Sequence, residues 1–307
     1  MTHVSRSSLT RYAWLSIGAA IVTLAMKSTA FALTGSVAVL SDALETLVNL
    51  GAAIVALVAL TVGARPPDED HAYGHGKIEY FSSGVEGTLI VLAAAAILVE
   101  AVNRLLHPEP LTVPGIGILI TILAALVNLA VGLILRRVGH RERSIALEAD
   151  AQHLLSDVWT SAAVVAGVGI VALTGWERLD PIVAILVGGQ LIYAGGRLLR
   201  RSTLGLLDTA LPEKELVAVE AILRHYVARG IGSHALRTRQ AGARAFVSVH
   251  IQVPGEWTVQ RGHEMLEEIE AKIRRAVPGV TVFTHLEPAE DPISWEDQSL
   301  DRPEVTD

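Results

Sequence analysis

The sequence predicts an α-helical membrane protein with six transmembrane helices, followed by a small cytoplasmic α+β domain. Hydrophobic residues make up 51% of the chain and charged residues only 19%, and the mean hydropathy is +0.44. That balance is unusual for a soluble domain. Long apolar segments recur up to Arg201, and the residues that follow have the mixed composition of a soluble domain.

The apolar segments are long enough to cross a bilayer, which takes about 20 apolar residues. The fourth is the clearest, because residues 112–135 carry no charge. No small-residue cleavage site closes the first segment, so it is interpreted as a span rather than a signal peptide. The six predicted spans are residues 13–33, 37–63, 80–105, 113–135, 147–174 and 181–201.

The basic residues of the connecting loops predict the topology. If the N-terminus is cytoplasmic, only Arg104 and Arg178 fall on the outside. Basic residues concentrate in cytoplasmic loops. We therefore expect a multi-pass protein of the inner (plasma) membrane with both termini in the cytoplasm. The residues then inside are Arg6, Arg11, Arg65, Lys77, Arg136, Arg137, Arg141, Arg143, Arg197, Arg200 and Arg201.

The soluble part is predicted to have the order αββαβ. The second strand alternates cleanly, with Val247 and Val249 on one face and His250 on the other, so His250 is not expected in the core. The predicted elements are a helix at 213–228, strands at 235–240 and 245–253, a helix at 258–276 and a strand at 280–287. The predicted domains are 1–207 in the membrane, 208–290 in the cytoplasm and a disordered acidic tail at 291–307.

Charge and cysteine content exclude several classes of function. The formal net charge of −7 and the pI of about 5.9 provide no basic surface for nucleic acid, so no nucleic-acid partner is expected. Without cysteine, the chain has no disulfide, thiolate metal site or cysteine nucleophile. A bound metal ion must therefore be held by carboxylate, imidazole, amide or water.

Two of the predicted spans carry polar trios at steps of three and four residues. An ionised side chain at mid-membrane costs about 2.5–3.5 kcal/mol on insertion scales, so the trios need a partner inside the bundle. Alternatively, they lie in headgroup water at span ends or pair with Lys27. A shared divalent cation is the simplest partner, and the spacing places each trio on one helix face. The trios are Asp42, Glu45 and Asn49, and Asp150, His153 and Asp157.

The mixed imidazole and carboxylate set suits a four-coordinate divalent ion. We expect Glu45, Asn49, His153 and Asp157 to be the ligands. Asp42 and Asp150 lie one turn nearer the helix starts, as orienting groups, water contacts or carboxylates on the entry path. Other isolated polar residues of the spans are more simply explained as interhelical hydrogen bonds or end residues: Glu86, Glu100, Asn103 and Asn128.

Two regions outside the spans are further candidates for metal binding. The loop that begins at Asp68 reads DEDHAYGHGK, which is either a cation-gathering site or a solvated charged loop. In the soluble domain, alternation places His250 and His285 on the same side of the sheet. The candidates there are His234, His250, His263, His285 and Glu287, and the alternative is a set of surface histidines without metal.

These features together resemble the cation diffusion facilitator family, in particular bacterial zinc/proton antiporters. The resemblance covers about residues 12–288. It rests on six spans, the segment SVAVLSDALETLVNL at 36–50, the DEDHAYGHGK loop, HLLSD at 153–157 and the αββαβ domain, all in the expected order.

The resemblance implies a role for each matched position. Glu45, Asn49, His153 and Asp157 would form the transport site. Asp68, His71 and His75 would form a loop site, and the four histidines with Glu287 would form a binuclear site in a copper-chaperone-like domain. The resemblance also implies a homodimer in which Lys77 and Asp208 pair as a charge interlock.

The chain departs from the family pattern at two ligand positions. Relatives that move zinc usually carry Asp or His at position 45 and Asp at position 49, where this chain has Glu45 and Asn49. Since Asn49 is neutral, Glu45 and Asp157 give the empty site a charge of at most −2. Zinc is the first candidate, with iron(II), manganese, cobalt and cadmium open.

The expected function is proton-coupled export of a divalent metal cation from the cytoplasm, without enzymatic activity; the cation is substrate and regulatory ion, and protons are the counter-ion. One alternative is an intramembrane metallohydrolase, but HExxH is absent and the ligand set leaves no open metal position. A membrane-anchored metal sensor without transport is the other, and it would not need charged residues inside the membrane.

Overall fold

The computed structural model of the chain describes residues 9–34, 37–107, 115–174, 178–296 and 298–299. Within these ranges, some side chains are outside the description: those at 30–31, 33–34, 37–45, 48, 116–117, 164, 167–174 and 179–180. The chain divides into two compact units, Met1–Leu206 and Leu207–Asp307.

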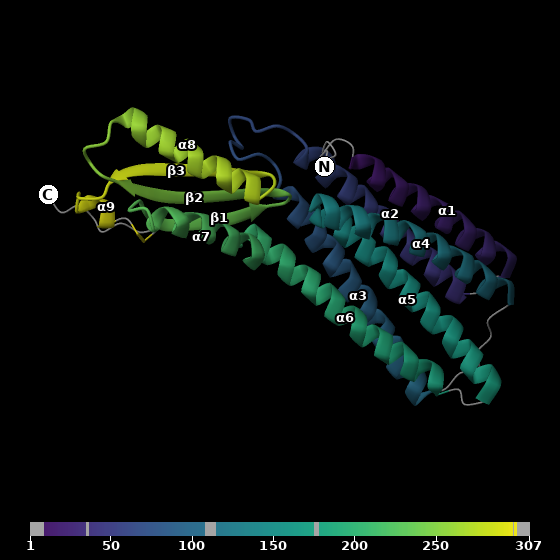
Figure 1. The fold of residues 1–307 in the computed structure, drawn as a ribbon. Coiled ribbons are helices and arrows are strands. Elements are labelled where there is room, and N and C mark those ends of the chain that lie inside the picture. Colours follow the sequence, from purple (N-terminus) through teal and green to yellow (C-terminus); the bar gives the residue numbers. More distant parts are fainter. Residues whose placement is uncertain (1–8, 35–36, 108–114, 175–177, 297, 300–307) are drawn as a thin grey trace. The chain divides into compact units, whose positions relative to one another are not determined.

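Six long helices make up the described part of the first unit (Figure 1). They follow the predicted spans closely, except that α4 runs beyond residue 135 through Arg136 and Arg137 to its end at Glu142. The helices are α1 Thr10–Thr34, α2 Val37–Gly63, α3 Ile78–Leu106, α4 Gly115–Glu142, α5 Ile145–Thr174 and α6 Leu179–Leu206.

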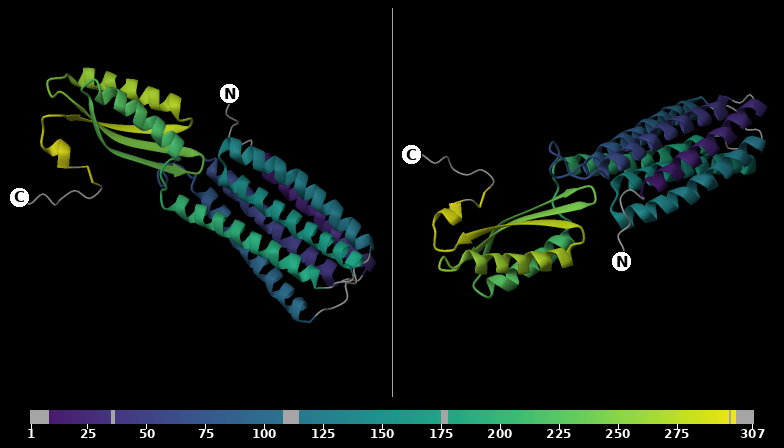
Figure 2. Two further views of the ribbon diagram at one scale, coloured as in Figure 1. Left: turned by 60° about the horizontal axis from the view of Figure 1, so that its bottom comes forward. Right: turned by 90° about the horizontal axis from the view of Figure 1, so that it is seen from above.

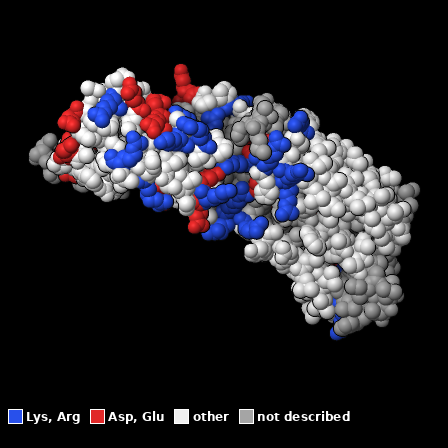
Figure 3. All heavy atoms as spheres, in the orientation of Figure 1, with Lys and Arg blue, Asp and Glu red and all other residues white. Residues whose placement is uncertain are grey.

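The surface of this helical unit is apolar, as lipid contact requires. Large apolar side chains such as Trp14, Val99 and Leu186 are exposed. Figure 3 shows a wide uncharged surface over the helical unit, with basic side chains gathered at one end. Among the described residues, three helical stretches are long and apolar enough to cross a membrane: Ile78–Leu106, Ile118–Glu142 and Pro181–Leu206.

Helix α5 has a central position in the helical unit and packs against several of the other helices. It lies between α4 and α6 (Figures 1 and 2). Ala151 and Leu154 pack in a cluster with residues of α1, α2 and α4, whereas Ala149 packs in a second cluster with residues of α3 and α6. Because α5 is packed on two sides, the polar residues that lie between these positions on α5 are also inside the bundle.

Small residues allow α3 and α6 to approach closely, as is typical of membrane helices. A Cβ atom at Gly205 of α6 would overlap the ring of Tyr80, which is buried on α3. We expect Gly205→Ala to destabilise the helical unit by about 1–3 kcal/mol, the usual cost of overpacking. Thermal unfolding in detergent measures this. Gly196→Ala on the same helix is the matched control, since its Cβ would meet nothing within 4 Å; equal losses in both variants would contradict the packing argument.

The second unit has the predicted αββαβ order (Figure 1). Its sheet has the order β1-β2-β3, with β1 antiparallel and β3 parallel to β2. The elements are α7 Glu213–Val227, β1 Gly232–Ala241, β2 Arg244–Val253, α8 Val259–Ala276, β3 Val280–Pro288 and α9 Ile293–Glu296.

Both long helices of this unit cover the same face of the sheet. Val219 of α7 and Ile269 of α8 are fully buried in one core with Val247 and Val249 of β2. Because strand residues alternate between faces, His250 lies on the face opposite the helices. The prediction that His250 is outside the core is therefore confirmed.

Two details of this unit correct the sequence analysis. Strand β1 begins at Gly232 rather than at 235, and its pairing shifts after His234, where Ala235 has a φ of 48°. The acidic tail from 291 was expected to be disordered throughout, yet Ile293–Glu296 forms α9. The Ser294 hydroxyl donates to the Pro288 carbonyl at 2.9 Å, which fastens α9 to the end of β3.

Candidate metal centres

Three of the predicted ligands meet inside the helical unit. Asn49 of α2 and His153 and Asp157 of α5 are buried, with exposed fractions of 6%, 6% and 8%. The amide nitrogen of Asn49 donates to Asp157 Oδ2, and its amide oxygen lies 2.6 Å from His153 Nε2. Asn49 therefore bridges the two α5 side chains and brings α2 and α5 together at this point.

The bridge determines which atom of His153 holds a hydrogen. An ionised carboxylate only accepts, so the amide nitrogen of Asn49 faces Asp157 and the amide oxygen faces His153. The amide oxygen cannot donate, so His153 Nε2 must carry the hydrogen. A metal ion could bind this nitrogen only after the hydrogen had moved to Nδ1 or left the ring.

Asn128 of α4 is a member of this group that the sequence analysis did not select as a ligand. Its amide nitrogen donates to Asp157 Oδ2 at 3.3 Å, which is an interhelical hydrogen bond to a candidate ligand. Its amide oxygen is buried and has no hydrogen-bond partner among the described residues. An amide oxygen is a ligand for hard and borderline cations, so Asn128 is available to an ion held by Asp157.

The remaining residues of the two trios are placed differently. The side chains of Asp42 and Glu45 lie outside the described residues. Asp150 is buried one turn before His153 and accepts a hydrogen bond of 2.9 Å from Ser16 of α1. Asp150 thus faces the bundle interior but is bound to a different helix from the Asn49 bridge.

The loop between α2 and α3 brings its three predicted ligands together. The ligand atoms of Asp68, His71 and His75 lie within 4.8 Å of one another. Asp68 accepts from the backbone N–H of His71 at 2.7 Å, and its second carboxylate oxygen lies 3.1 Å from His75 Nε2. Gly74, with a φ of 84°, provides the left-handed turn that returns His75 to the carboxylate.

The carboxylate of this loop remains charged. Desolvation acts to raise the pKa of Asp68, but hydrogen bonds from the backbone and ring of His71 and the proximity of His75 outweigh it. The net effect lowers the pKa of Asp68 below its ordinary value. An anionic carboxylate beside two imidazoles is a suitable donor set for a divalent cation.

In the soluble unit, three histidines form a row across the sheet. The strand register pairs His234 with His250 and His250 with His285. Neighbouring ring centroids are 5.1 Å and 5.0 Å apart. Glu287 joins the row, with one carboxylate oxygen 2.7 Å from His234 Nε2 and the other 2.9 Å from His250 Nδ1.

The other two predicted ligands of this site are less closely placed. His285 Nε2 lies 3.6 Å from Glu287 Oε1, and its side chain is 63% exposed. His263 is exposed on α8, which covers the opposite face of the sheet. Within the described part of one chain, the compact ligand group is His234, His250 and Glu287, and the role of His263 stays a prediction.

Removing the carboxylate of Glu287 should weaken metal binding at the row. We expect Glu287→Gln to reduce the zinc affinity of the full-length protein at this site by roughly 10–100-fold, because neutral amide replaces the only anionic donor of the group. Competition with a chromophoric chelator measures the affinity. Glu290→Gln removes an exposed carboxylate that accepts a hydrogen bond from the Gly255 N–H, and a similar loss there would contradict the assignment.

The two residues of the predicted interlock have partners in their own units. Lys77 Nζ donates to the Leu206 carbonyl at 3.3 Å. Asp208 Oδ1 accepts from Arg239 at 3.3 Å. Since these residues belong to different units, their pairing stays a prediction.

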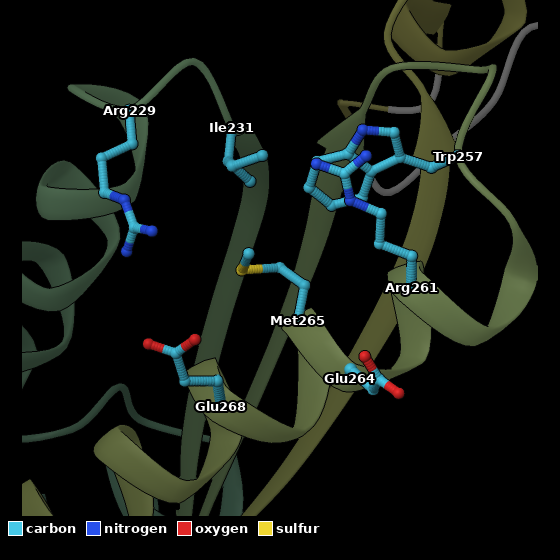
Figure 4. Close-up of a pocket in the computed structure, with 7 residues that line it drawn as sticks. All are labelled: Arg229, Ile231, Trp257, Arg261, Glu264, Met265 and Glu268. Carbon is cyan, nitrogen blue, oxygen red and sulfur yellow. The ribbon is translucent and has the colours of Figure 1, made fainter.

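The soluble unit also has a cavity of about 350 Å³ that is separate from these sites (Figure 4). Arg261 stacks over the Trp257 ring at 3.9 Å. Hydrogen bonds from Lys272 and Tyr226 lower the pKa of Glu268. The two guanidinium groups offset the two carboxylates, which leaves no net charge to attract a metal cation. The lining residues are Arg229, Ile231, Trp257, Arg261, Glu264, Met265 and Glu268.

A helical membrane unit with buried nitrogen and oxygen donors, joined to a soluble domain with a histidine row, defines a membrane transporter for metal cations. The chain belongs to the cation efflux family: residues 13–207 match the model of the cation efflux transmembrane domain, and residues 211–289 match that of the cation efflux protein cytoplasmic domain. It is therefore a transporter of divalent metal cations and not an enzyme, which excludes the metallohydrolase alternative.

Individual relatives cover almost the whole chain. An uncharacterised transporter of Synechocystis, sll1263, is 50% identical over 93% of this chain and 92% of its own length. The cation-efflux pump FieF of Shigella flexneri is 30% identical over 93% of both chains. A solved structure of CzrB, a candidate zinc transporter in its Zn form, is 32% identical over 27% of this chain and 93% of its own, with a TM-score of 0.25.

Proposed function

We propose that this protein exports zinc from the cytoplasm in exchange for protons. The transported ion would be held by Glu45, Asn49, His153 and Asp157. The observation that carries the proposal is the buried convergence of Asn49 with His153 and Asp157. Iron(II), manganese, cobalt and cadmium are the alternatives to zinc.

The donor chemistry supports zinc among these cations. One imidazole and two carboxylates suit a four-coordinate borderline ion, and Asn49 contributes an amide oxygen. In the soluble unit, two histidines and one glutamate form a compact group, a donor set that zinc sites use repeatedly. If metal bound to the soluble unit regulates transport, the ion bound there would be the same as the ion bound at the transport site.

Competition between zinc and protons for His153 supports exchange with protons. Zinc binds an unprotonated ring nitrogen, so the hydrogen on Nε2 must first move to Nδ1 or to water, and protonation of His153 from the acidic outer side would release the zinc. Inward proton movement would thereby drive outward metal movement. Access would alternate by rocking of the helices that carry the site against the other spans.

The arrangement of the whole transporter follows from the same proposal. Both termini would lie in the cytoplasm, where residues 208–290 would bind metal and form a homodimer, with the Lys77–Asp208 interlock near the membrane surface. Residues 1–207 would carry transport. Metal on the loop and tail sites would regulate transport only if it binds one conformation better than the other.

Flux measurements test the proposal directly. The purified protein is reconstituted in vesicles, a pH gradient is imposed, and zinc, iron(II), manganese, cobalt and cadmium uptake are compared. We expect zinc uptake to be fastest and to stop when an ionophore collapses the proton gradient. Zinc uptake that is indifferent to the gradient would overturn proton exchange, and faster flux of another metal would overturn the choice of zinc.

A further inference from the structure

A second pair of acidic residues is buried in the helical unit. Glu86 of α3 has an exposed fraction of 0% and Asp150 of α5 one of 2%. The two carboxyl groups are close enough for their charges to interact. The helices meet at this level, because Ile90, one turn beyond Glu86, packs in the same cluster as Ala149.

Each carboxyl group has one bound and one open oxygen. Ser82 donates to Glu86 Oε1 at 3.4 Å, and Ser16 donates to Asp150 Oδ1 at 2.9 Å. Glu86 Oε2 and Asp150 Oδ2 are buried and have no hydrogen-bond partner among the described residues. Among the described residues, no hydrogen bond or ion pair joins either carboxyl group to a basic side chain.

Other acidic residues at the start of these helices have hydrogen-bond or ion-pair partners. Glu79 accepts a hydrogen bond of 2.5 Å from Ser144. Glu148 forms an ion pair with Arg201. The side of α6 that packs nearby presents Gly195 and Leu199 to Gly87, which follows Glu86, and neither is charged. The open oxygens therefore distinguish Glu86 and Asp150 from residues that serve packing.

Two like charges cannot both be buried without a counter-ion, so the empty pair must hold at least one proton. A divalent cation that replaces this proton would be offered the open carboxylate oxygens Glu86 Oε2 and Asp150 Oδ2. Such oxygen ligands suit hard and borderline divalent cations. A pair with one proton has a charge of −1; binding of a divalent cation and loss of the proton to water leave the site neutral.

We propose that Glu86 and Asp150 form a second metal site inside the membrane, which exchanges one proton for the divalent cation before it reaches His153 and Asp157. The inference rests on the proposed function and its orientation, since α5 then starts at the cytoplasmic side and Asp150 precedes His153 by one turn. This second site would be an intermediate binding site for the cation between the cytoplasmic water and the site that Asn49 bridges.

Infrared difference spectroscopy of the full-length protein in lipid tests this site. Zinc addition is expected to remove the C=O band of a protonated carboxyl group in the wild type. Glu86→Gln and Asp150→Asn are each expected to abolish that change, whereas Glu86→Asp keeps it. Glu79→Gln is the matched control, because Glu79 is buried on the same helix but already bound, and it should retain the change.

Transport gives a second, independent readout. We expect Glu86→Gln to raise the KM for zinc entering from the cytoplasmic side by roughly 10–100-fold, with Glu79→Gln unchanged. A band that persists in both pair variants, or that never changes in the wild type, would overturn the second site. The loss of the band without any zinc flux in the wild type would instead overturn the proposed export function and leave the second site in place.

Discussion

Replacing Asp157 by asparagine is expected to stop metal transport while the protein stays folded. Asp157 Oδ2 accepts hydrogen bonds from both Asn49 and Asn128, so it joins α2, α4 and α5 at one oxygen. The substitution retains the size of the side chain but removes its negative charge. Positions 49, 128 and 157 would then all carry amides, and His153 would provide the only imidazole among these four residues. We expect zinc flux to fall by more than roughly 100-fold, beyond the effect of losing an outer-shell partner.

Vesicle uptake and metal binding measure this effect together. Glu100→Gln is the matched control, because it removes a carboxylate of α3 that is exposed and paired with Arg104. Size-exclusion chromatography and thermal unfolding establish that both variants fold. Wild-type flux in the Asp157→Asn protein would remove the Asn49–His153–Asp157 group from the transport pathway.

Restoring an aspartate at position 49 is expected to change metal preference. Asn49 donates to Asp157, and an ionised aspartate cannot donate, so the empty site would need a shared proton between the two carboxylates. Metal binding would then release one more proton and gain one more anionic ligand. We expect the zinc affinity to rise at least tenfold at alkaline pH, which is about 1.4 kcal/mol, and to fall more steeply as the pH falls.

Isothermal titration in buffers of different ionisation enthalpy counts the released protons, and competitive uptake gives the order of metals. Asn103→Asp, near the end of α3 and exposed, is the control for adding a carboxylate to a membrane helix. If Asn49→Asp leaves both the proton count and the metal order unchanged, Asn49 is not a ligand.

Much of the fold follows from local patterns. Apolar length predicts α1 to α6, since a membrane span must satisfy its backbone and present apolar side chains to lipid. Alternation along β2 predicts which face carries His250. The strand register, which places His234 opposite His250, depends on an irregularity near Ala235, and a period-2 pattern cannot predict where a strand departs from that period.

The candidate sites were predictable where their members share one helix or loop. His153 and Asp157 are four residues apart, so their common face is evident from spacing. Asn128 contacts Asp157 from another helix, and a single asparagine in an apolar span has no periodic signal. The proximity of Glu86 and Asp150 likewise depends on how α3 packs against α5, which no spacing within either helix encodes.

The histidine row draws its compact group from β1, β2 and β3, one residue from each strand. An ion bound there would hold all three strands together. The free energy of unfolding would therefore rise with metal concentration, by about 2.7 kcal/mol at a free metal concentration 100 times Kd. In cells with little metal, the less stable metal-free protein would be degraded fastest by proteases. The abundance of the exporter would then follow the metal concentration without any change in gene expression.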